Sequence, residues 1–112
     1  MTRYLISFDD GAMDHVVDDL EQAAADAHDV LRDAKAAGVW VTGGGVMRQR
    51  AIIIGVDGSP TPGDFPERKA VIGGFSIIEV PTMREAQHWA ARIAQACRCA
   101  QEIRVLMDDP EV

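Results

Sequence analysis

The sequence predicts an α+β domain with a ferredoxin-like βαββαβ order and an extra hairpin or loop excursion in its middle. Two helical patterns, near residues 16–37 and 82–97, each lie between stretches rich in β-branched residues. Two βαβ halves most economically form a four-stranded antiparallel sheet with both helices on one face. With 112 residues, the chain is predicted to be a single domain, residues 1–112.

The first half begins with a strand over residues 3–8, in which Tyr4, Ile6 and Phe8 face one way. A polar loop over residues 9–14 precedes a helix over residues 16–37. Its apolar stripe is spaced by three and four residues and comprises Leu20, Ala24, Ala27, Leu31 and Ala34. The small side chains of this stripe predict that the helix lies close to the sheet. Residues 39–42 form the next strand, which we expect the glycines 43–45 to stop.

The second half begins with an Ile-rich strand over residues 51–56, which ends at the turn signal Asp57–Gly58. Residues 59–66 contain three prolines and are predicted to be an exposed loop. A buried strand over residues 75–80 leads to a capping box from Thr82 to Glu85, which starts the second helix. The last strand is expected over residues 102–107.

The strands are apolar on both faces, whereas the two helices can cover only one face of the sheet. The second face therefore needs a cover, and the simplest cover is another copy of the chain. The sequence thus predicts a homodimer.

Charge and composition restrict the partners. The net charge of −7 disfavours contact with nucleic acid and with anionic membranes. The first eight residues reach Asp9–Asp10 too early for a signal peptide, and no apolar run is long enough to span a bilayer, so a cytoplasmic location is expected. Cys97 and Cys99 are interpreted as small buried side chains in a reducing compartment.

Several segments, taken together and in order, resemble the YCII-related family and its DGPF-type branch. The segments are residues 4–8, 36–45, 67–80, 85–91 and 97–104. The resemblance implies a dimeric α/β barrel in which two ferredoxin-like sheets pack face to face. It also implies similarity to muconolactone isomerases and related small barrel enzymes, and a frequent association with genes for extracytoplasmic-function sigma factors. One branch is thought to use a His-Asp pair for acid-base chemistry.

The chain departs from the family pattern at two places. The Asp-Gly-Pro-Phe motif that names the branch falls on residues 62–65, which read Pro-Gly-Asp-Phe. The aspartate of the His-Asp pair would fall near residues 91–93, which contain no carboxylate.

His28 is the best catalytic candidate, because a neutral imidazole can take up or release a proton near pH 7. Asp10 and Asp64 are the loop carboxylates that could orient it, although a half-buried histidine bonded to backbone is the simpler interpretation. Trp40 could line a ligand pocket, and four basic side chains could converge on an anion: Arg48, Arg68, Lys69 and Arg104. For Arg104 the alternative is a cross-strand ion pair with Glu102. No metal site and no cofactor are predicted.

Three functions follow as hypotheses. The first is a homodimeric binding protein for a small organic molecule, held in a cavity beside the sheet and walled by Trp40, Phe8 and Phe75. The second is a lyase or isomerase with His28 as the general acid-base. The third is a regulatory interaction protein linked to a sigma factor.

Overall fold

The computed structural model describes residues 1–65 and 71–112 of the chain. Its elements in order are β1 (Thr2–Asp9), the 3₁₀ helix η1 (Asp14–Asp19), α1 (Leu20–Ala36), β2 (Trp40–Gly45), β3 (Ile52–Ile54), β4 (Pro60–Pro62), β5 (Ile72–Val80), α2 (Met83–Cys97) and β6 (Glu102–Val105).

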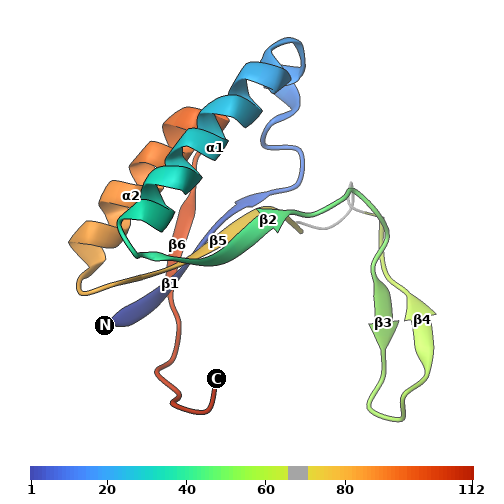
Figure 1. The fold of residues 1–112 in the computed structure, drawn as a ribbon. Helices are drawn as coiled ribbons and strands as arrows, with labels where there is room; N and C mark the ends of the chain where they lie inside the picture. Colours follow the sequence, from blue (N-terminus) through green and yellow to red (C-terminus); the bar gives the residue numbers. More distant parts are fainter. Residues whose placement is uncertain (66–70) are drawn as a thin grey trace.

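Four of the strands form one antiparallel sheet in the order β2-β5-β1-β6, and both helices lie on one face of it (Figure 1). The central strand β1 pairs with β5 and with β6, so that Ile6 lies opposite Ser76 on one side and Ile103 on the other. The predicted ferredoxin-like fold is therefore confirmed.

The core lies between the sheet and α2. Tyr4 and Ile6 of β1 and Ile78 and Val80 of β5 point to the helices because alternate residues of a strand share a face. They pack against the small residues Ala86 and Ala90 of α2, and the fully buried Ile6 and Ile78 form its centre.

The two helices begin differently. The predicted helix over residues 16–37 is shorter than expected, because residues 14–19 form the 3₁₀ helix η1 and Val16 departs from helical geometry with φ −106° and ψ 18°. Helix α2 begins where the capping box predicts, since the backbone N–H of Glu85 donates to the Thr82 hydroxyl over 3.2 Å.

The glycines of residues 43–45 continue β2, so the prediction that they stop the strand is wrong. Gly43, Gly44 and Gly45 pair with β5 at Ser76, Phe75 and Gly74. A Cβ atom on Gly43 would lie 2.5 Å from the Phe75 carbonyl oxygen and 2.9 Å from the Ser76 Cα. The missing side chain thus allows close approach of two backbones, which is a use of glycine other than ending a strand.

The double glycine at residues 73–74 serves the same purpose on the other side of β5. A Cβ on Gly74 would lie 2.6 Å from the ring of Phe8, and one on Gly73 would lie 2.9 Å from the backbone of Asp10. The ring of Phe8 therefore rests directly on the backbone of β5.

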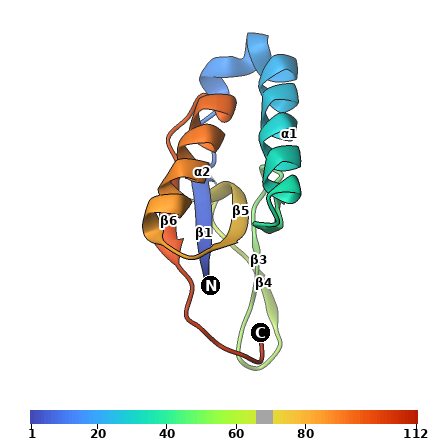
Figure 2. The ribbon, with the colours of Figure 1, turned by 60° about the vertical axis from the view of Figure 1, so that its left-hand side comes forward.

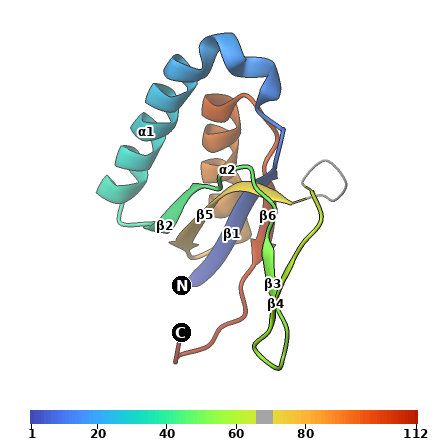
Figure 3. The same ribbon diagram turned by 90° about the vertical axis from the view of Figure 1, so that its right-hand side faces the viewer.

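Strands β3 and β4 form a separate two-stranded hairpin, which we call the arm (residues 51–63). All three views place the arm on the side of the sheet away from the helices (Figures 1, 2 and 3). The prediction that residues 59–66 are a loop is wrong for Pro60–Pro62, which pair with Ile52–Ile54. Prolines are accepted there because their nitrogens point away from β3.

Within the described residues, none of the helices has the length and apolar character needed to cross a membrane.

Candidate functional site

A cavity of about 290 Å³ lies beneath α1, between the helices and the β2 side of the sheet. Among the described residues, the aromatic side chains of Phe8 from β1, Trp40 from β2 and Trp89 from α2 line it. Phe75 of β5 also borders the cavity, but strand alternation places its ring on the other face of the sheet, with Ile77. The backbone of residues 43–45 lines it as well and brings no side chain to fill it. The cavity is therefore mostly apolar, with flat aromatic surfaces.

The apolar stripe of α1 explains why this space is empty. Leu20, Ala24, Ala27, Leu31 and Ala34 all line the cavity. The expected close approach of this helix to the sheet is wrong, because α1 packs mainly on α2 and makes few contacts with β2. Alanines that face bulky aromatic residues at that distance leave a void instead of filling it.

Among the residues that the structure describes, three polar side chains interrupt the apolar lining: His28 of α1, Ser76 of β5 and Gln101 before β6. His28 is exposed and makes no side-chain hydrogen bond within residues 1–65 and 71–112. The interpretation of His28 as half-buried and bonded to backbone does not describe this geometry. Gln101 donates weakly to the Cys99 carbonyl oxygen over 3.4 Å. A molecule in the cavity would thus meet an imidazole, a hydroxyl and an amide.

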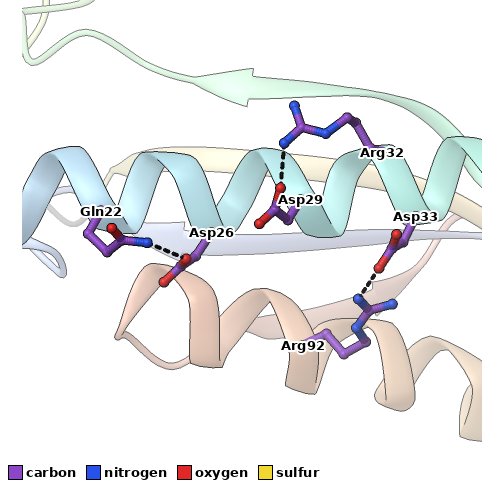
Figure 4. Close-up of polar contacts among 6 residues, drawn as sticks. All are labelled: Gln22, Asp26, Asp29, Arg32, Asp33 and Arg92. Carbon is purple, nitrogen blue, oxygen red and sulfur yellow. Dashed lines mark hydrogen bonds and ion pairs between the residues drawn. The ribbon is translucent and has the colours of Figure 1, made fainter.

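Ion pairs hold α1 on α2 and fix the outer wall of the cavity. Arg92 of α2 binds Asp33 of α1 (Figure 4). At the other end of the helix pair, Arg98 lies 3.0 Å from Asp19 and 3.0 Å from Asp26. Asp26 also accepts a hydrogen bond from Gln22 over 2.8 Å, and the bonds from Gln22 and Arg98 lower the pKa of its carboxyl group.

A second cavity of about 300 Å³ lies at the base of the arm. It is lined by Asp10, Arg48 and Asp64, together with apolar residues such as Ile53 and Val71. The Arg48 guanidinium binds Asp10 over 2.9 Å and Asp14 over 3.3 Å, and these hydrogen bonds raise the pKa of Arg48. Asp10 is thus already paired with a cation, and its side chain is only 15% exposed.

The predicted catalytic residues therefore lie in two places. His28 lines the cavity beneath α1, whereas Asp10 and Asp64 line the cavity at the arm, and no hydrogen bond joins His28 to either carboxylate in the described part of the chain. Trp40 lies with His28, and Arg48 lies with the two aspartates. An acid-base mechanism here would rest on His28 without these partners.

Of the remaining predicted ligand-binding residues, the structure describes Arg104, which lines neither cavity. Arg104 is exposed and bound to Glu102 over 2.7 Å, an ion pair within β6 and not one across strands. Arg68 and Lys69 lie outside the described residues.

Both cysteines belong to the region around the first cavity. Cys97 is buried, lines the cavity and is a free thiol, as is Cys99. Burial raises the pKa of both thiols, and the neighbouring Cys99 raises that of Cys97 further. Such thiols stay protonated at neutral pH and are poor nucleophiles.

Sequence reasoning missed the residues that close the cavity, such as Trp89, Ile93 and Gln101. The spacing of Trp89 on α2, three residues after Ala86, indicates a core position and does not show that the side chain also borders a cavity. The alanines of α1 are the sequence feature that could have predicted a cavity here. When one face of a helix holds so many small side chains, either large side chains pack against it or a space is left.

A four-stranded antiparallel sheet with both helices on one face, and an aromatic cavity beneath one of them, defines a small ferredoxin-like α+β protein. The family comparison is more specific: the model of the YCII-related domain matches residues 3–108, and the chain belongs to this family.

Among solved structures, the chain resembles 5-chloro-2-hydroxyhydroquinone dehydrochlorinase (TftG) from Burkholderia phenoliruptrix AC1100 in complex with 2,5-dihydroxybenzoquinone. The TM-score is 0.54 at 15% sequence identity, and the similarity covers 99% of this chain and 98% of the other. At this identity the likeness shows a shared fold. No curated protein sequence matches the chain.

Proposed function

We propose that the chain binds a small, flat organic molecule in the cavity beneath α1. The observation that carries the proposal is the lining, in which the aromatic side chains of Phe8, Trp40 and Trp89 border about 290 Å³ and, among the described residues, His28, Ser76 and Gln101 add polar groups. Ligand sites are mostly apolar and contain a few placed polar groups, and this volume is at the lower end of their range. A single substituted ring is the ligand class that such a space accepts.

The fold relative TftG supports this class, because its structure contains 2,5-dihydroxybenzoquinone, a single ring with polar substituents. In this chain, the aromatic faces would stack on such a ring, and the polar groups of the lining would meet its oxygens.

The test is a thermal-shift screen with single-ring quinones, hydroquinones and hydroxybenzoates. A ligand that binds only the folded chain raises the Tm as its concentration rises above the Kd. We expect at least one ring compound to do so, whereas aliphatic acids of the same charge do not. If no ring compound shifts the Tm at millimolar concentration, the proposal is wrong.

A second candidate is an acid-base enzyme of the lyase or isomerase type that uses His28. It is favoured by an accessible imidazole in the wall of the cavity, where a bound molecule would meet it. His28→Ala should then abolish turnover while the Tm stays unchanged, because the exposed side chain of His28 makes no hydrogen bond with the described part of the chain. Unchanged turnover in His28→Ala would leave only the binding function.

We also propose that the chain is a homodimer formed through the face of the sheet opposite the helices. Leu5 and Ile77 pair on that face. Arg3 with Glu79, and Arg104 with Glu102, bring charges of both signs to it, which suits a two-fold contact between identical surfaces. Sedimentation should show a dimer that Leu5→Lys converts to monomers. A lone protomer at every concentration would contradict this proposal.

A further inference from the structure

The arm has one open edge and one blocked edge. The backbone N–H of Gly63 donates to the Ala51 carbonyl oxygen over 2.8 Å, and that of Gly55 donates to Ser59 over 2.9 Å. In an antiparallel pair, hydrogen-bonded and non-bonded residue pairs alternate. The pairs Ile52–Pro62 and Ile54–Pro60 are therefore non-bonded, and their backbone groups point away from the hairpin.

The outward positions differ between the two strands. On β4 they hold Pro60 and Pro62, which have no N–H to offer. On β3 they hold Ile52 and Ile54, each of which presents an N–H and a C=O that have no backbone partner within residues 1–65 and 71–112. Only β3 can accept another strand along its full length.

The side chains of this open edge are apolar and face water. Ile52, Ile53 and Ile54 are 73%, 51% and 61% exposed. An isolated two-stranded hairpin is only marginally stable in water, and a flat apolar edge strand is a template for pairing. The arm therefore has the properties of a docking strand.

We infer that the open edge of β3 pairs antiparallel with β3 of a second copy of the chain, with Ile53 on the two-fold axis. In this register Ile52 lies opposite Ile54 of the other copy. Their outward N–H and C=O groups then form a regular set of bonds, four in all by symmetry. Ile53 lies opposite its own equivalent as a non-bonded pair.

Charge favours a copy of the same chain as the occupant. The chain has a net charge of −7, so two copies meet most easily where neither is charged, and residues 51–56 carry no charge. Residues 52–54 are also all isoleucine, so the same register places apolar side chains opposite apolar side chains on both faces of the paired arms.

The register is tested by disulfide crosslinking in a background with Cys97→Ala and Cys99→Ala. Under mild oxidation, Ile53→Cys should form a disulfide between two copies, because non-bonded pairs bring Cα atoms to about 4.5 Å. Ile52→Cys and Ile54→Cys are the matched controls. Each should crosslink at least tenfold more slowly, because neither residue faces its own equivalent.

The edge itself is tested with the double variant Ile52→Pro and Ile54→Pro. It removes the two outward N–H groups and leaves the hairpin's own hydrogen bonds intact, as the native prolines of β4 do. We expect it to reduce crosslinking through Ile53→Cys at least tenfold, whereas Val56→Ser, which removes an exposed apolar side chain beyond β3, should not. In the unmodified chain, hydrogen exchange should show protected amides at Ile52 and Ile54.

Equal crosslinking at all three isoleucines, no crosslinking at Ile53, or unprotected amides at Ile52 and Ile54 would overturn the inference. A different protein on this edge would appear as protection without the Ile53 crosslink and would overturn it too. These readouts are local to the arm. They can therefore fail while the cavity ligand and the dimer through the sheet face remain, or succeed where those fail.

Discussion

Arg98, the residue that ends α2, holds Asp26 of α1 with its guanidinium at 3.0 Å. Its backbone has φ 59° and ψ 32°, a left-handed conformation in which glycine is usual after a helix. The chain keeps an arginine there, at a conformational cost, and the side chain joins the two helices that cover the cavity. The ion pairs of Arg98 with Asp19 and Asp26 offset the cost of this backbone conformation.

The variants Arg98→Ala and Arg98→Gly separate these two effects. Alanine loses the ion pairs and keeps the unfavourable backbone, so we expect a Tm several degrees below that of the wild-type chain. Glycine loses the same pairs and relieves the backbone, so its Tm should lie between the two. Thermal melts of the three chains at low salt measure this order, and a glycine variant less stable than the alanine variant would contradict it.

Asp26 should make stability depend on pH in the acid range. Its pKa is lowered in the folded chain by the hydrogen bonds from Gln22 and Arg98. A lowered pKa means that its contribution is fully present above the pKa of the unfolded chain, and that it is lost as the pH falls through the folded value.

Acid titrations of the wild type and Asp26→Asn test this dependence. The wild type should be the more stable at neutral pH, and the difference should shrink as the pH falls below the ordinary aspartate range. A difference that stays constant down to pH 2 would show that charge on Asp26 is irrelevant.

Gly43 and Gly44 give a matched pair of substitutions in β2. Gly43→Ala places a Cβ 2.5 Å from the Phe75 carbonyl oxygen, so the strands must separate, and we expect a loss of about 2–3 kcal/mol of stability. Gly44→Ala meets no atom within 4 Å and should change stability by less than about 0.5 kcal/mol. Urea unfolding measures both, and equal effects would show that the approach of β2 to β5 is looser than described.

Filling the cavity should separate stability from binding. Ala27→Leu puts new apolar atoms into the space beneath α1 and should add about 1 kcal/mol of stability, while it removes the Tm shift caused by a ring compound. Ala25→Leu is the control, because Ala25 is exposed and does not line the cavity. If Ala27→Leu binds the compound as tightly as the control does, the ligand occupies another place.

The sheet and the helices could be predicted from the sequence because their patterns are local. Alternation in residues 3–8, the apolar stripe of α1 and the cap at Thr82 each determine one element, and few topologies join them. The path of residues 43–45 and 60–62 could not be predicted in this way. Whether glycine or proline ends a strand depends on which backbone lies beside it, and that partner is distant in sequence.

The candidate site was predictable only in part, for a related reason. Phe8, Trp40 and Phe75 were expected to wall a cavity, and Phe8 and Trp40 do so, whereas the ring of Phe75 lies on the other face of the sheet. His28 and the two aspartates were grouped by chemical type. Their separation follows from the end of β1, where Asp10 turns toward Arg48 at the base of the arm. The spacing of residues along the chain does not predict the direction of that turn.

The two prolines of β4 have a consequence for how far self-association can go. If the arms pair through β3, the strands at the outside of the resulting four-stranded unit are both β4, and Pro60 and Pro62 give each of these edges no N–H donors at the outward positions. A third copy finds no edge with N–H donors on the paired arms, so strand addition through the arms stops at two chains. The same isoleucine run with donors on both edges would be able to grow into a fibre.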